Sequence, residues 1–128
     1  MDQYNKKVMN YFLKPKNVGV IKNADGIGKI DNRICGDSLY VYIKVGKNKK
    51  KEEIIKDIKF KSFGCVANIA TSVVLTELAK GKSLEKAKTI SNKEVIKKLG
   101  FLPKQKIHCS ILAVDGLKRA IEDYEKKK

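Results

Sequence analysis

Three cysteines and one histidine are the residues of this chain with the most distinctive chemistry. Cys35 stands in the stretch RICGDSLY, Cys65 in FKSFGCVAN, and Cys109 directly follows His108, the only histidine among the 128 residues. Asp37 lies two residues beyond Cys35. Three thiols and an imidazole, with a carboxylate nearby, are ligands of the kind that bind zinc or an iron–sulfur cluster. The sequence indicates a metal centre if the fold brings these residues together.

Each of these residues also has an ordinary structural interpretation. Free cysteine is among the most buried residue types, so any one of the three thiols taken alone is more often a small core residue. A single histidine is more often structural or exposed than a ligand, and Asp37 fits a turn residue that hydrogen-bonds local backbone N–H groups. The position of all three cysteines at element boundaries favours the metal centre.

Length, cysteine content and hydropathy predict a single domain with free thiols and no membrane-spanning segment. A chain of 128 residues fits one compact domain, and we expect residues 1–128 to form it. Three cysteines cannot all pair within one chain, so free thiols in a reducing cytoplasm are expected. No segment resembles a signal peptide or approaches the roughly 18 to 20 apolar residues that span a bilayer, so no membrane partner is predicted.

The net charge of +15 comes almost entirely from lysine, since Arg33 and Arg119 are the only arginines among 29 basic residues. Nucleic-acid-binding proteins usually concentrate arginine beside aromatic residues, whereas these lysines are spread along the chain. A solvated surface that favours acidic partners is therefore expected, with no nucleic acid. A lysine-rich nucleic-acid-binding module remains the remote alternative, and it would bind with a steep negative dependence on salt.

Alternating apolar residues predict three strands. Leu39, Val41, Ile43 and Val45 alternate with polar or aromatic residues in SLYVYIKV, and Ile58 and Phe60 do so in IKDIKFKSF. GIGKIDNRI, residues 26–34, has weaker strand character, and GKNKKKEE, residues 46–53, fits a hairpin connection. These segments predict a small antiparallel sheet with one buried face.

Helical spacing predicts the remaining elements. An amphipathic helix is expected from about residue 2 to 13, and a core helix from Val66 to about Leu78, ending at Gly81. Two short helices follow, one capped by Ser83 and one with a capping box at 91–94. The last helix is expected to start around Cys109 or Ser110, with an apolar face of Ile111, Leu112, Val114, Leu117, Ala120, Ile121 and Tyr124. The fold class is α+β, with helices packed on one face of the sheet.

This arrangement predicts where the reactive residues meet. In a hairpin, the start of the second strand and the end of the third lie at the same end of the sheet, which brings Cys35 and Cys65 together. A glycine beside each cysteine lets a turn present its sulfur without crowding. Cys65 and Cys109 both stand near helix N-termini, where backbone N–H groups stabilise a thiolate.

Three ordered motifs resemble those of the IscU/NifU-type iron–sulfur cluster assembly scaffolds. They are CGD at 35–37, FGC at 63–65 and HCS at 108–110, and the segments KPKNVG, TELAKGKSLEKA and HCSILAVDGLKRAIEDY also match. The resemblance covers nearly the whole chain. It implies a three-stranded antiparallel sheet packed with helices, in agreement with the elements expected from the residues.

The resemblance implies a role for each candidate residue. Cys35, Cys65 and Cys109 match the cluster-binding cysteines, and His108 or Asp37 provides the fourth ligand. Asp37 also matches the aspartate that keeps the cluster labile, and Cys109 is the best match to the cysteine that accepts persulfide sulfur. The implied cofactor is a transient 2Fe–2S cluster made from iron, and zinc can occupy the same ligands in a purified protein.

The implied partners follow from cluster assembly. They are a cysteine desulfurase, donors of iron and electrons, and apo iron–sulfur acceptor proteins. The protein would be a scaffold or carrier and not an enzyme, acting as a monomer or as an oligomer bridged by a cluster. Where the family has LPPVK, recognised by an Hsp70-type chaperone, this chain has LPKQK at 102–106, which argues against that partner.

Other departures from the family pattern fall near the cysteines and in the last helix. Val66 and Asn68 alter the small-residue run after Cys65, and Gly116 replaces the usual alanine, which should loosen the helix slightly. The closest rival is the SufU-like branch, which holds zinc and relays sulfur from a desulfurase. Its members typically have an insertion before the last cysteine and lack the adjacent histidine, so His108 favours the scaffold.

Overall fold

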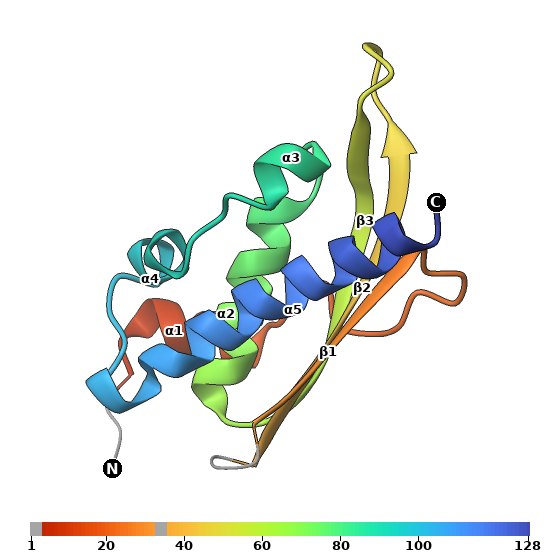
Figure 1. The fold of residues 1–128 in the computed structure, drawn as a ribbon. Helices are drawn as coiled ribbons and strands as arrows, with labels where there is room; N and C mark the ends of the chain where they lie inside the picture. Colours follow the sequence, from red (N-terminus) through yellow and green to blue (C-terminus); the bar gives the residue numbers. More distant parts are fainter. Residues whose placement is uncertain (1–3, 33–35) are drawn as a thin grey trace.

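An antiparallel sheet of three strands forms one layer of the molecule, and helices cover one of its faces (Figure 1). The computed structural model describes residues 4–32 and 36–128. The strands are β1 (Gly26–Asn32), β2 (Asp37–Lys47) and β3 (Glu53–Phe63), in the order β1-β2-β3. The predicted α+β class and all three strands are confirmed.

The two long strands follow the predicted alternation. Val41 pairs with Phe60 and Ile43 with Ile58 across the β2–β3 hairpin, and all four side chains are buried. The turn is shorter than the predicted connection, because β2 runs to Lys47 and β3 begins at Glu53. The Asn48 side chain accepts hydrogen bonds from the backbone N–H groups of Lys50 and Glu52, which closes this tight turn.

Helix α2 (Val66–Ala79) is buried around most of its circumference and not only along one apolar stripe. Its buried residues include Thr71, Ser72 and Thr76, whose hydroxyl groups donate hydrogen bonds to backbone carbonyls within the helix. Ile69 and Leu78, which the periodicity places on the core face, are only partly buried. The helix packs between α1, α4, α5 and β3, so it is enclosed by neighbours on most sides.

The short helices have the caps that the sequence predicts. Ser83 caps α3 (Leu84–Ala87), and Ser91 and Glu94 form a complete capping box at α4 (Asn92–Leu99). Helix α1 (Lys6–Leu13) starts later than the predicted residue 2. Asn5 is its N-cap, and the Asn5 side chain accepts a hydrogen bond from the backbone N–H of Val8, so the helix begins at Lys6. Residues 2 and 3 of that predicted helix lie outside the described residues.

The last helix, α5 (Ile107–Lys126), begins earlier than predicted. A 3-10 turn, η1 (Lys104–Lys106), leads directly into it, so Cys109 is the third residue of the helix instead of its first. The prediction that Ile111 lies on the buried face is wrong, because 45% of its surface is exposed, and Leu112 is only partly buried. The buried stripe passes through the small residues Ala113 and Gly116 instead.

Small residues allow α5 to lie very close to the sheet (Figure 1). A Cβ atom at Gly28 would lie 2.1 Å from the carbonyl oxygen of Gly116, and one at Gly26 would lie 2.1 Å from that of Ala120. A Cβ at Gly116 itself would lie 2.9 Å from Cγ2 of Val41. Gly116 therefore serves a close helix–sheet contact, and the loosening expected from its low helix propensity is not its main consequence.

The helices of the described residues do not include a membrane span. None of them combines the length and the apolar character that crossing a bilayer requires.

Candidate metal centre

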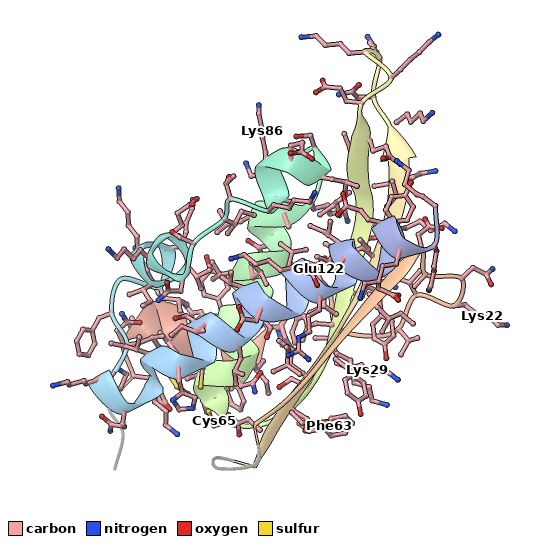
Figure 2. The ribbon with its side chains drawn as sticks, in the orientation of Figure 1. Lys22, Lys29, Phe63, Cys65, Lys86 and Glu122 are labelled. Atoms are coloured by element: carbon pink, nitrogen blue, oxygen red, sulfur yellow. The ribbon has the colours of Figure 1, made fainter. Side chains whose placement is uncertain are left out.

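The candidate site lies at the end of the sheet where β2 begins and β3 ends. Asp37 is the first residue of β2, and Ser38 pairs with Phe63, the last residue of β3. Cys65 follows two residues later as the N-cap of α2, and Figure 2 shows it at this end of the molecule. The predicted antiparallel geometry thus brings Asp37 and Cys65 together. Cys35 lies outside the described residues.

Helix α5 brings its own residues to the same place. The Sγ atoms of Cys65 and Cys109 are 3.8 Å apart, and Oδ2 of Asp37 lies 3.7 Å from the first and 3.8 Å from the second. Nε2 of His108 lies 3.6 Å from Sγ of Cys109. Asp37, His108 and Cys109 have ligand atoms within 4.8 Å of one another. Four of the five candidate residues therefore converge.

These distances suit a tetrahedral metal ion. With zinc–sulfur bonds of about 2.3 Å and zinc–oxygen bonds of about 2.1 Å, the edges of a regular tetrahedron are about 3.6 to 3.8 Å long. The three separations among the Asp37 oxygen and the two sulfurs are 3.7, 3.8 and 3.8 Å. The spacings of Asp37, Cys65 and Cys109 are therefore compatible with zinc or a tetrahedral iron ion.

Burial differs around the site. Cys109 and Asp37 are buried, with 1% and 8% of their surfaces exposed, whereas Cys65 and His108 are only partly buried. Among the described residues, the exposed side of the site is therefore that of Cys65 and His108. A metal ion or a sulfur donor can approach from that side while Cys109 and Asp37 form the inner wall.

The two thiols share a hydrogen bond, and their pKa values move in opposite directions. The hydrogen bond from Cys109 lowers the pKa of Cys65 to about 6, although desolvation and the Asp37 carboxylate oppose this. The nearby backbone N–H of Asn68 lowers the pKa of Cys65 further. The same hydrogen bond, with burial, raises the pKa of Cys109 strongly. Of the two described thiols, Cys65 is therefore the one that ionises near neutral pH.

This asymmetry corrects one expectation. The helix N-termini predict thiolates at both Cys65 and Cys109, but the pKa of Cys109 is raised instead. Cys109 is more deeply buried, and the negative charges of Cys65 and Asp37 both disfavour a second anion beside them. Metal binding would have to displace this proton, since a thiolate is the form that binds metal.

Two residues beside the site were not among the candidate ligands. A Cβ atom at Gly64 would lie 2.6 Å from Nδ2 of Asn68 and 2.9 Å from Cγ of Asp37, so the absent side chain leaves room for both. Asn68 has only 1% of its surface exposed. One signal in the sequence was available: an asparagine three residues after Cys65 interrupts an otherwise small and apolar helix start.

Comparison with protein families gives a match over nearly the whole chain. The family model described as the NifU-like N terminal domain matches residues 3–128. The chain is 52% identical over 124 residues to the iron-sulfur cluster assembly scaffold protein IscU 1 of Archaeoglobus fulgidus, covering 97% of this chain and 78% of that protein. It is 46% identical over 128 residues to the protein named IscU of Rickettsia prowazekii, covering 98% and 94%.

Solved structures show the same fold. A putative iron-sulfur cluster assembly scaffold protein for the SUF system, from Fervidobacterium islandicum, aligns with a TM-score of 0.71 at 20% identity, over 92% of this chain and 96% of that one. The N-terminal part of a NifU-like protein from Brucella abortus aligns with a TM-score of 0.69 at 17% identity, over 97% and 95%. At these identities the similarity concerns the fold alone.

Proposed function

Because this chain belongs to the NifU-like N-terminal domain family, we propose that it is a scaffold on which a 2Fe–2S cluster is assembled and from which the cluster passes to acceptor proteins. The observation that carries this proposal is the convergence of Asp37, Cys65 and Cys109, with spacings that suit tetrahedral iron or zinc. Cys35 is proposed as the third cysteine ligand on the basis of the CGD motif.

The fourth ligand is proposed to alternate between His108 and Asp37. Both have ligand atoms within 4.8 Å of each other and of Cys109, so either can complete a site that contains this cysteine. A carboxylate oxygen is a harder ligand than a thiolate and suits iron in a cluster less well. Coordination by Asp37 would therefore keep the cluster labile, and coordination by His108 would retain it longer.

Sulfur is proposed to arrive as a persulfide carried by a cysteine desulfurase. The thiolate of Cys109 would attack the outer sulfur, form a new S–S bond and release the desulfurase cysteine as a thiolate. Two electrons from a donor protein would then reduce the new bond and release sulfide to iron. Iron bound at Cys65 and Asp37 would neutralise the charges that hold the Cys109 proton, which would make Cys109 the nucleophile.

The proposed partners follow from these steps. They are the desulfurase, donors of iron and electrons, and apo iron–sulfur acceptors, and the +15 charge favours acidic surfaces on them. We place the protein in the cytoplasm, where reduced thiols persist. It acts as a carrier without turnover of its own, either as a monomer or as a pair of chains bridged by a cluster.

A zinc-binding sulfur relay of the SufU type is the second candidate. The spacing of the two sulfurs and the carboxylate suits zinc as well as iron. His108 favours the scaffold over this alternative, because it stands beside Cys109 where SufU-like chains typically lack a histidine.

Anaerobic reconstitution tests the scaffold function. The protein is incubated with iron, cysteine and a desulfurase, and we expect the absorption spectrum of a 2Fe–2S cluster together with acid-labile sulfide. Cys65→Ala should abolish the spectrum. Ser72→Ala, which removes a buried hydroxyl from the same helix, should retain it. Tightly held zinc with no cluster spectrum would instead support the sulfur relay.

A further inference from the structure

Asn68 is a buried residue of α2, and only one end of its carboxamide forms a hydrogen bond among the described residues. Its Oδ1 atom accepts a hydrogen bond of 2.9 Å from the hydroxyl of Ser62. Its Nδ2 atom is buried and has no hydrogen-bond partner among the described residues. An unpaired donor in a protein interior costs free energy, so a partner that arrives later would be a reason to keep it.

The unpaired end of Asn68 lies beside Asp37. The missing side chain of Gly64 marks the space between them, because a Cβ there would be 2.6 Å from Nδ2 of Asn68 and 2.9 Å from Cγ of Asp37. No hydrogen bond joins the two groups among the described residues. The Asp37 carboxylate instead directs Oδ2 toward the sulfurs of Cys65 and Cys109.

The hydrogen-bonding groups of Ser62 and Asp37 determine which end of the Asn68 carboxamide faces each of them. A serine hydroxyl both donates and accepts, so Ser62 can pair with either end of the Asn68 carboxamide. An ionised carboxylate only accepts, so the end that faces Asp37 is favourable only as the NH2 group. With Nδ2 on the side of Asp37, Oδ1 accepts from Ser62 and the carboxylate faces a group that can donate to it.

We propose that Asn68 is a positioning residue for Asp37, and that its Nδ2 donates a hydrogen bond to the carboxylate oxygen that does not bind iron. This inference rests on the proposed function, in which Asp37 binds the iron of the cargo cluster. A carboxylate that ligates a metal through one oxygen is held in place by hydrogen bonds to the other. Asn68 thus supports the state in which Asp37 is the ligand, in competition with His108.

Zinc binding to the full chain provides the test, because zinc is redox-inactive and needs no desulfurase. Affinity is measured by competition with a chromophoric chelator for the wild type, Asn68→Ala, Asp37→Ala and the double variant. Loss of a residue that orients a metal ligand typically weakens binding about 10- to 100-fold. We expect a loss of about 10-fold from Asn68→Ala when Asp37 is present, and no further loss when Asp37 is alanine.

A matched control and a direct signal complete the experiment. Ser72→Ala removes a hydroxyl that donates to the backbone carbonyl of Asn68 but leaves the Asn68 carboxamide in place, and it should leave zinc affinity unchanged. In the 15N-labelled wild type, the side-chain NH2 resonances of Asn68 should shift on zinc addition, and in Asp37→Ala they should not. If Asn68→Ala does not fold, Asn68→Leu, of similar size and without polar atoms, replaces it in the cycle.

The outcomes separate this inference from the function on which it rests. Equal losses from Asn68→Ala in both Asp37 backgrounds, or NH2 resonances that zinc does not move, would overturn the role of Asn68 and leave the scaffold intact. A wild-type protein that binds neither zinc nor a cluster would overturn both. Coupling between Asn68 and Asp37 in zinc affinity, together with the resonance shift, would support the proposal.

Discussion

The hydrogen bond between Cys65 and Cys109 determines how each thiol should react with an alkylating agent. It is the largest contribution that lowers the pKa of Cys65 to about 6, from an ordinary value of 9.0. At pH 7, a thiol with a pKa of 6 is about 90% thiolate, whereas one with a pKa of 9 is about 1% thiolate. In the metal-free protein we therefore expect Cys65 to be alkylated from about pH 6 upward and Cys109 to remain protected.

Cys109→Ala removes the hydrogen-bond donor, so the pKa of Cys65 should rise toward its ordinary value. A complete return to 9.0 would cut the thiolate fraction at pH 7 about 90-fold. The nucleophilicity of each thiolate rises with its pKa, with a slope of about 0.4 to 0.5, which recovers about 16- to 30-fold. The net expectation is alkylation about 3- to 6-fold slower at pH 7, but faster than in the wild type above pH 9.

This reversal with pH distinguishes a pKa effect from a change in access to Cys65. The assay is iodoacetamide labelling of metal-free protein between pH 5 and 10, with each cysteine quantified in its own peptide by mass spectrometry. Ser110→Ala, beside Cys109, is the control and should leave the Cys65 midpoint unchanged. A midpoint that stays near 6 in Cys109→Ala, or wild-type Cys109 that reacts at lower pH than Cys65, would refute the assignment of the thiolate.

Three further predictions concern the sheet contact, acid stability and the cluster. Gly28→Ala places a methyl group 2.1 Å from the Gly116 carbonyl oxygen, so the free energy of unfolding in urea should fall by about 3 kcal/mol; a fall below about 1 kcal/mol would contradict the close contact. The Asp123 carboxylate accepts a hydrogen bond from the backbone N–H of Ile27, and this bond lowers the pKa of Asp123. The ionised carboxylate therefore stabilises the folded state above its ordinary pKa of 3.8, and this contribution is lost as the pH falls through the lower pKa of the folded state. Asp123→Asn should therefore lose less stability in acid than the wild type, and an identical acid profile would contradict this. Asp37→Ala should hold a reconstituted cluster longer, and equal or faster transfer to an apo acceptor would count against a labilising role.

The elements around the site could be predicted because their signals are local. Alternation in SLYVYIKV and IKDIKFKSF predicts the β2–β3 hairpin, and antiparallel pairing then requires Asp37 and Cys65 to lie at one end of it. Likewise the Ser91–Glu94 box predicts the start of α4 from neighbouring residues alone.

What could not be predicted depends on contacts between distant segments. Ile111 fits the apolar periodicity of α5, yet the close approach at Gly116 turns another stripe of the helix toward the sheet and leaves Ile111 45% exposed. The division of charge between Cys65 and Cys109 depends on a sulfur–sulfur distance of 3.8 Å, which no motif specifies. The unpaired amide of Asn68 is visible only once Gly64 and Asp37 are placed beside it.

The contact between Gly28 and Gly116 has a consequence for repeated loading and unloading of the site. Cys109 precedes Gly116 by seven residues of one helix, about 10 Å, and Asp37 begins the strand whose Val41 faces Gly116. The contact thus sets the distance between Cys109 and Asp37, two of the proposed ligands, from a buried position that contains no ligand residue. Iron, sulfide or an oxidant can alter the sulfurs without reaching it, so an emptied site would keep the dimensions needed for its next cargo.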